Sequence, residues 1–85
     1  MTLEKVKDRI RTALRTYFDE DDFVDVSDGP ADDVYVVIVS RKFDGQRMRE
    51  KNDLIWSILT QQLPPDEWGK VSLSVGTSPE EIKAT

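Results

Sequence analysis

The sequence predicts an α+β domain with the element order α-β-β-α-β-α, in which a small three-stranded mixed sheet packs against helices. Apolar residues recur at helical spacing near the N-terminus and again between about residues 48 and 63. Two runs rich in β-branched residues lie between these segments, separated by Asp-Gly and Gly-Pro turn dipeptides. A third run, Lys70–Val75, alternates apolar and polar residues. With no internal repeat or linker, we expect residues 1–85 to form a single domain.

The first helix begins after Thr2, whose hydroxyl suits the N-cap position. One face is predicted to be apolar, and it carries Leu3, Val6, Ile10, Leu14 and either Tyr17 or Phe18. The acidic run 19–22 should end this helix, because carboxylates at a helix C-terminus oppose the macrodipole.

The strands follow from their composition. Phe23–Val26 should pair antiparallel with Val34–Ser40 across the loop 27–33. Because Val34–Ser40 is apolar on both faces, we expect it to be the central strand, covered on both sides. A right-handed helical crossover should make Lys70–Val75 parallel to it. Its alternation predicts three inward residues, Val71, Leu73 and Val75, and three outward ones, Lys70, Ser72 and Ser74.

The second helix should run from about Met48 to Leu63 and stop at Pro64 and Pro65. Its apolar stripe is predicted to consist of Met48, Ile55, Ile58, Leu59 and Leu63. Residues 66–69 read as a turn, and Ser78 followed by Pro79 and two glutamates reads as the capped start of a last helix. The pattern leaves open whether Trp56 and Trp68 belong to the core or to a docking patch.

The composition excludes several kinds of chemistry. The chain has no cysteine and no histidine, which removes disulfides, thiolate or imidazole metal sites and the familiar nucleophile–histidine arrangements. Glu50 and Asp53 could pair on one helix face, but solvated surface acids are the more common reading, so we expect no enzyme activity, cofactor, metal site or small-molecule substrate. No apolar run reaches the roughly 20 residues that cross a bilayer, and we expect a cytoplasmic protein without membrane contact.

Charge is distributed unevenly along a chain whose net charge is −5. Eight acids and no base lie between Asp19 and Asp33, whereas Arg41–Lys51 holds five bases and two acids, a local balance of +3. This pattern predicts an electrostatic dipole. A glycine turn that presents bases at a helix start can hold an anion or a partner. The predicted contact residues are Arg41, Lys42, Gly45, Arg47, Arg49, Lys51 and Asn52.

The order and spacing of several segments resemble the BolA family, which has a class II KH-like fold. The resemblance rests on the opening helix, on residues 23–28 as a V-x-V-x-D/S strand, and on 37–40 followed by 43–47 as the V-x-V-S-x-x-F-x-G-x signature. The helix around 54–59 and the strand around 73–75 complete the pattern. Family members typically carry R-H-R where this chain has Lys51-Asn52-Asp53, and H-A-L where it has Val71-Ser72-Leu73. A further Cys or His is often found in their first hairpin loop, near residues 28–30 here.

The resemblance implies a regulatory module without enzyme activity. Family histidines and thiols ligate an iron–sulfur cluster shared with a monothiol glutaredoxin, and neutral Asn52 and apolar Val71 cannot replace them. KH domains clamp nucleic acid with G-x-x-G, of which Gly45 supplies only the first glycine. We therefore expect weakly specific, phosphate-driven binding of DNA through the basic segment 41–51. The alternative is a cluster-free protein-interaction adaptor, for example for a monothiol glutaredoxin, that docks through the same region.

Overall fold

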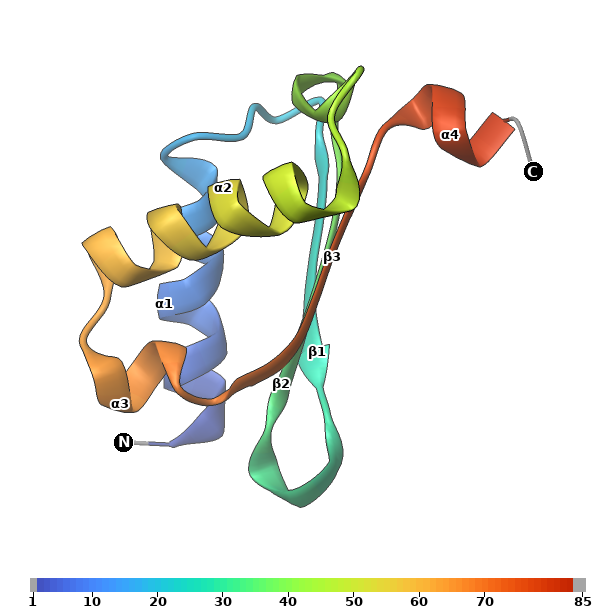
Figure 1. Cartoon of the computed structure of the whole chain (residues 1–85). Helices are drawn as coiled ribbons and strands as arrows, with labels where there is room; N and C mark the ends of the chain where they lie inside the picture. The colour runs from blue at the N-terminus through green and yellow to red at the C-terminus, as the bar shows by residue number, and fades with distance from the viewer. Residues whose placement is uncertain (1, 84–85) are drawn as a thin grey trace.

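The protein folds into two layers, and the structure, a computed structural model, describes residues 2–83. Helices cover one face of a three-stranded sheet, while the opposite face is open except at one end, where α4 lies (Figure 1). The elements are α1 (Leu3–Arg15), β1 (Phe23–Asp28), a 3₁₀ turn (Pro30–Asp32), β2 (Val34–Val39), a second 3₁₀ turn (Arg41–Phe43), α2 (Met48–Gln62), α3 (Pro65–Trp68), β3 (Val71–Thr77) and α4 (Pro79–Lys83). The predicted α+β class and element order are confirmed.

Helix α1 begins as predicted, because the Thr2 hydroxyl accepts a hydrogen bond from the Lys5 N–H at 3.3 Å. The apolar face is buried, and Phe18 rather than Tyr17 completes it. The helix ends at Arg15, before the acidic run. The Arg15 guanidinium donates to the carbonyls of Asp19 and Asp22, so the acidic loop folds back over the helix end.

The sheet has the order β1-β2-β3, with β1 antiparallel and β3 parallel to the central strand, as the crossover rule predicts. The expectation that β2 is covered on both faces is wrong. Val34, Val36 and Ile38 are fully buried under the helices, whereas Val37 and Val39 are only half-buried on the open face. The crossover between β2 and β3 places α2 on one face of the sheet, and α1 packs on the same face beside it.

The predicted facing of β3 is also wrong beyond its first residue. The register shifts between two pairs, from Val34–Val71 to Tyr35–Leu73, so Ser72 is an extra residue. A bulge of this kind reverses which face the following side chains point to. Leu73 and Val75 therefore lie on the open face, whereas Ser74 and Gly76 face the helices. A Cβ at Gly76 would lie 2.9 Å from the Phe43 ring, so this strand needs glycine where the core approaches it.

Helix α2 packs Ile55, Ile58 and Leu59 onto the core and ends as expected before the two prolines. Met48 is wrongly placed in the predicted stripe, since its side chain is 77% exposed. The predicted turn at 66–69 contains the short helix α3. The two tryptophans are partly buried against the core, with their rings in edge contact at 6.0 Å. None of the helices in residues 2–83 is both long and apolar enough to cross a membrane.

Candidate nucleic-acid and partner interface

The turn between β2 and α2 holds the predicted contact residues in place. Ser40 caps the 3₁₀ turn by accepting from the Lys42 N–H at 3.1 Å, and the next residue, Phe43, is fully buried against Phe18. Gly45 then adopts a φ of +74°, a left-handed conformation that favours glycine. The turn is therefore anchored by its aromatic residue and reversed by its glycine, and its charged side chains are exposed.

The start of α2 already carries an internal acidic cap. The Glu50 carboxylate accepts a hydrogen bond from the Arg47 N–H at 2.9 Å. This contact satisfies one of the donors at the helix N-terminus and offsets part of its positive potential. The Glu50 carboxylate is thus occupied as a helix cap. This role differs from the pairing with Asp53 that was considered from the sequence. The N-terminus of α2 therefore presents less positive potential than an uncapped helix end.

Four of the predicted bases are exposed: Arg41, Lys42, Arg47 and Arg49. Lys42 is partly neutralised, because its ammonium lies 3.8 Å from the Asp19 carboxylate and 5.2 Å from the centre of the Tyr17 ring. Within residues 2–83 the other three, all arginines, have no acidic partner. We call Arg41, Arg47 and Arg49 the arginine group. Their guanidinium groups are the cations that this end of the molecule offers to a ligand.

Lys51 and Asn52 differ from the exposed bases. The Lys51 side chain is buried, and its ammonium donates to both Glu81 oxygens at 2.5 and 2.7 Å. This bond lowers the pKa of Glu81 below its ordinary value. The Asn52 amide oxygen accepts from the Ser74 hydroxyl at 3.4 Å. Both predicted contact residues thus face the protein, where they join α2 to α4 and to β3.

Helix α4 is held to the rest of the fold by a capping box as well as by this ion pair. The Ser78 hydroxyl accepts from the Glu81 N–H at 3.2 Å, and the Glu81 carboxylate accepts from the Ser78 N–H at 3.3 Å. The sequence pattern at 78–81 predicted the box. Nothing local predicted Lys51 as the partner of Glu81, since the two residues are 30 positions apart in the chain.

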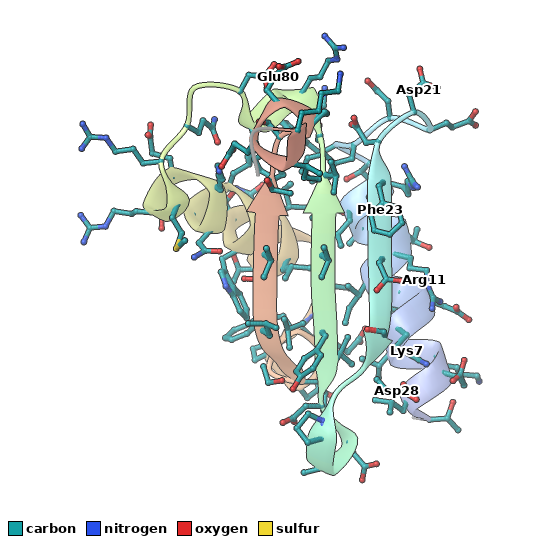
Figure 2. All side chains as sticks on the ribbon, turned by 90° about the vertical axis from the view of Figure 1, so that its right-hand side faces the viewer. Lys7, Arg11, Asp21, Phe23, Asp28 and Glu80 are labelled. Carbon is teal, nitrogen blue, oxygen red and sulfur yellow. The ribbon has the colours of Figure 1, made fainter. Side chains whose placement is uncertain are left out.

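The predicted separation of acidic from basic residues is incomplete. The acidic loop 19–22 lies at the same end of the molecule as the basic turn, and both border one hollow of about 380 Å³. Asp28 lies at the other end, where it pairs with Lys7 at 2.7 Å, as Figure 2 shows. The hydrogen bond to Asp28, followed by one to Glu4, raises the pKa of Lys7. Acids therefore flank Arg41 and Lys42, while Arg47 and Arg49 project from the turn and the start of α2.

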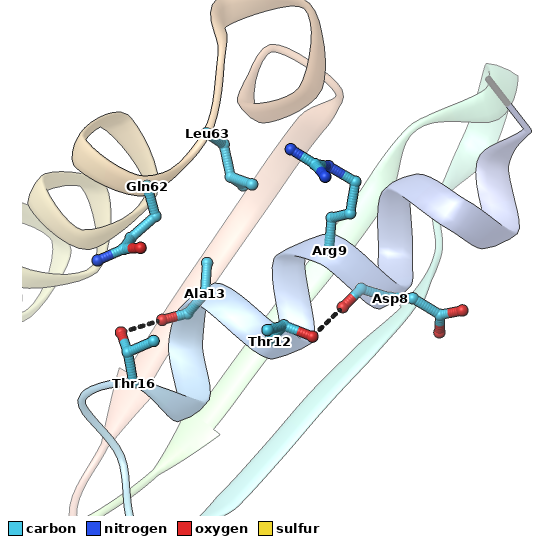
Figure 3. Close-up of a pocket in the computed structure, with 7 residues that line it drawn as sticks. All are labelled: Asp8, Arg9, Thr12, Ala13, Thr16, Gln62 and Leu63. Atoms are coloured by element: carbon cyan, nitrogen blue, oxygen red, sulfur yellow. Dashed lines mark hydrogen bonds between the residues drawn. The ribbon is translucent and has the colours of Figure 1, made fainter.

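A second hollow, of about 360 Å³, lies between α1 and the end of α2 (Figure 3). Its hydroxyls are used within the helix: Thr12 donates to the Asp8 carbonyl at 3.0 Å and Thr16 to the Ala13 carbonyl at 2.6 Å. Arg9 in its wall binds the buried carboxylate of Glu67. The described residues contain no cluster of three acids, cysteines or histidines that could hold a metal ion. This hollow holds no acid–base pair or nucleophile arranged for a reaction.

Comparison with solved structures identifies the architecture. BolA1 from Arabidopsis thaliana superposes with a TM-score of 0.67 over 89% of this chain and 94% of that chain. The fold is BolA-like. The two sequences are 19% identical over this match, so the likeness concerns the fold. No protein-family model matches the sequence, and a comparison with curated protein sequences gives no match either. The BolA-like resemblance seen in the sequence is therefore confirmed by the three-dimensional structure.

The BolA-like fold raises the question of an iron–sulfur cluster, and the residues present do not fit one. Asn52 is engaged with Ser74, and Val71 is a buried apolar side chain packed in the core. A cluster iron needs thiolate or imidazole donors, and neither side chain supplies one. We therefore derive no cluster chemistry for this chain.

Proposed function

We propose that this protein is a non-enzymatic binding module that contacts the phosphate backbone of nucleic acid with the arginine group. The observation that supports the proposal is the exposure of three guanidinium groups, without acidic partners in residues 2–83, on the anchored turn and the start of α2 that follows it. Guanidinium groups bind phosphate oxygens through paired N–H donors and stay charged at any physiological pH. A net charge of −5 confines the interaction to this turn, because the rest of the surface repels the polyanion.

The binding should be weak and strongly salt-dependent. Three phosphate contacts predict a slope of about −2.7 for the logarithm of the binding constant against the logarithm of salt concentration on duplex DNA. Sequence preference should be small, since backbone contacts carry no base information. A steeper slope would require contacts beyond the arginine group.

The test is an amide-resolved NMR titration with a short DNA duplex at about 50 and 200 mM salt. We expect shifts at Gly45–Arg49 that weaken at the higher salt and disappear in the double variant R47S/R49S. The matched control is K5S/K70S, which removes the same charge from exposed positions at the opposite end of the molecule. Equal loss in both double variants would show a mere net-charge effect, and unchanged binding in R47S/R49S would refute the proposal.

A second candidate function, a protein-interaction adaptor, is favoured by Met48. This side chain is 77% exposed between two arginines, and flexible methionines of this kind serve as contacts on protein-binding surfaces. The partner could be a monothiol glutaredoxin or another protein. Met48→Ser separates the two functions: it should leave DNA binding unchanged and weaken an interaction that buries the thioether. Loss of DNA binding in this variant would argue against a purely phosphate-directed site.

A further inference from the structure

Strand β3 forms one edge of the sheet, and the backbone groups on its outer side are unpaired within residues 2–83. Its backbone pairs with β2 on one side, and no hydrogen bond reaches its other side from residues 2–83. All seven residues of Val71–Thr77 are uncharged, and none is proline. Natural proteins usually protect edges with charges, prolines, bulges or a covering segment, because unpaired N–H and C=O groups template another strand. On β3 the protection is limited to the bulge at Ser72 and to the start of α2, which contacts Ser74, and the strand has no charge and no proline.

Apolar surface adjoins this edge on the open face. Leu73 is 45% and Val75 is 39% exposed, and they lie beside the half-buried Tyr35 and Val37 of β2. Contiguous exposed apolar side chains of this kind mark interaction sites more often than chance. In Figure 2 this face is turned toward the viewer, with β2 and β3 side by side and Phe23 on β1. A strand added at β3 would extend this apolar surface with its own side chains.

On the face of the sheet that the helices cover, α2 runs beside the edge of β3. Asn52 contacts Ser74, and Trp56 lies one turn further along the same helix face. Trp56 is partly buried against Trp68, which precedes β3 in the chain. An added strand would therefore place alternate side chains against the open face and against this flank, so that both faces of the strand are contacted.

Charges stand at both ends of the edge. Lys70 directly precedes β3 and is exposed without an ion pair in residues 2–83. The turn that carries Arg47 lies at the far end, because the Phe43 ring packs on Gly76, and Arg49 follows on the first turn of α2. Acids stand at these ends too, since Asp32 borders one hollow with Lys70, and Glu80 on α4 follows β3. Both ends of the edge therefore carry charges of both signs, and the middle is neutral.

We propose that the outer edge of β3 binds an extended segment of a partner protein as a fourth strand, and that this segment is apolar at alternate positions. Only backbone in the β conformation can pair with the unpaired groups of β3, and the main-chain hydrogen bonds supply affinity while side-chain contacts supply selectivity. The apolar positions of the segment match Leu73 and Val75. The proposal goes beyond nucleic-acid binding, because it uses the backbone of β3, and it assigns a partner chemistry to the adaptor function.

The probe is a synthetic peptide of about nine residues, with two glutamates at each end and alternating valine and threonine between them. The control peptide carries proline in place of the threonines, which removes N–H donors without adding charge. We expect the first peptide to shift the amides of Val71–Thr77 and slow their hydrogen exchange. The proline peptide should bind at least about tenfold more weakly.

The matched protein variants are Leu73→Asp on β3 and Phe23→Asp on β1, since both residues are exposed on the open face and the change in charge is the same. Leu73→Asp should weaken the peptide by about tenfold or more, and Phe23→Asp should leave the affinity within about twofold. If Leu73→Asp does not fold, Leu73→Ser provides the same comparison without the charge.

Three results would overturn the proposal. Peptide-induced shifts confined to 23–28, or none at millimolar peptide, would show that the β3 edge does not accept a strand. Shifts of Val71–Thr77 that depend on protein concentration alone would assign the edge to a second copy of this chain. The DNA titration is independent of these outcomes, because its shifts are expected at 45–49 and its decisive variant is R47S/R49S.

Discussion

The two edge strands of this sheet, β1 and β3, differ in how their outer sides are protected. On β1, the Arg11 guanidinium from α1 donates to the Val26 carbonyl at 3.0 Å, and Asp25 places a charge in the middle of the strand. Figure 2 shows Arg11 beside this edge. On β3 neither device is present. The two edges therefore differ in kind: β1 is protected by a charge and a side-chain donor, whereas β3 has a bulge at Ser72 and an uncharged outer side.

The largest expected effect concerns the aromatic residues that accompany each strand. Phe43 is fully buried against Gly76 of β3, whereas Phe23 on β1 is 55% exposed. Phe43→Ala should lower the free energy of unfolding by about 3–5 kcal/mol, because it empties a packed core site. Phe23→Ala should lower it by less than about 1 kcal/mol.

Urea unfolding of both variants measures this difference. If Phe43→Ala does not fold, Phe43→Leu should still be more destabilising than Phe23→Leu. Equal losses for the two positions would contradict the assignment of Phe43 as the anchor between the basic turn and β3.

A smaller effect tests the protection of β1. Arg11→Ala should destabilise the protein by about 1 kcal/mol, because the Val26 carbonyl loses a charged donor in a partly buried place. It should also speed amide exchange in β1 relative to β3. The exposed ion pair of Arg11 with Asp8, at 2.6 Å, is lost as well, so Asp8→Ala serves as the control. Asp8→Ala should lower the free energy of unfolding by less than about 0.5 kcal/mol. If both variants lose the same stability, the ion pair and not the contact with Val26 accounts for the effect of Arg11.

The smallest effect is local and depends on pH. The hydrogen bond from Lys51 lowers the pKa of Glu81 in the folded protein. The ionised Glu81 therefore stabilises α4 fully at any pH above the ordinary glutamate pKa. This stabilisation is lost as the pH falls through the lowered pKa of the folded state. The amides of residues 79–83 should therefore move toward unfolded positions as the pH falls below the ordinary pKa of a glutamate, about 4.3. NMR spectra recorded against pH follow this change, with β2 amides as the control for global unfolding.

Glu81→Gln provides the corresponding control at neutral pH. It removes the charge that Lys51 binds, so residues 79–83 should already be displaced at pH 7 and should show no further titration from this site. Residues 79–83 that match the unmodified protein at pH 7 would show that the ion pair does not hold α4 in place.

The candidate site was predicted unevenly. The turn, its glycine and the exposed arginines follow from the local pattern at 43–49, because a glycine at positive φ and a helix start are local features. Lys51 looked like one more base on that segment. Its burial depends on Glu81, which comes from a distant helix, and no spacing rule connects the two. The neighbourhood of the acidic loop and the basic turn was missed for the same reason.

The sequence by itself determined the elements, their order and the strand directions, because these depend on periodicity, capping residues and the handedness of crossovers. Only the tertiary structure decided which faces are covered. A single extra residue at Ser72 reversed the facing of Leu73 and Val75, and a helix layer on one side alone left them exposed. A bulge depends on how two strands fit each other and the core beneath them, so alternation within one strand cannot reveal it. The open edge and the apolar face beside it are therefore properties of the assembled fold.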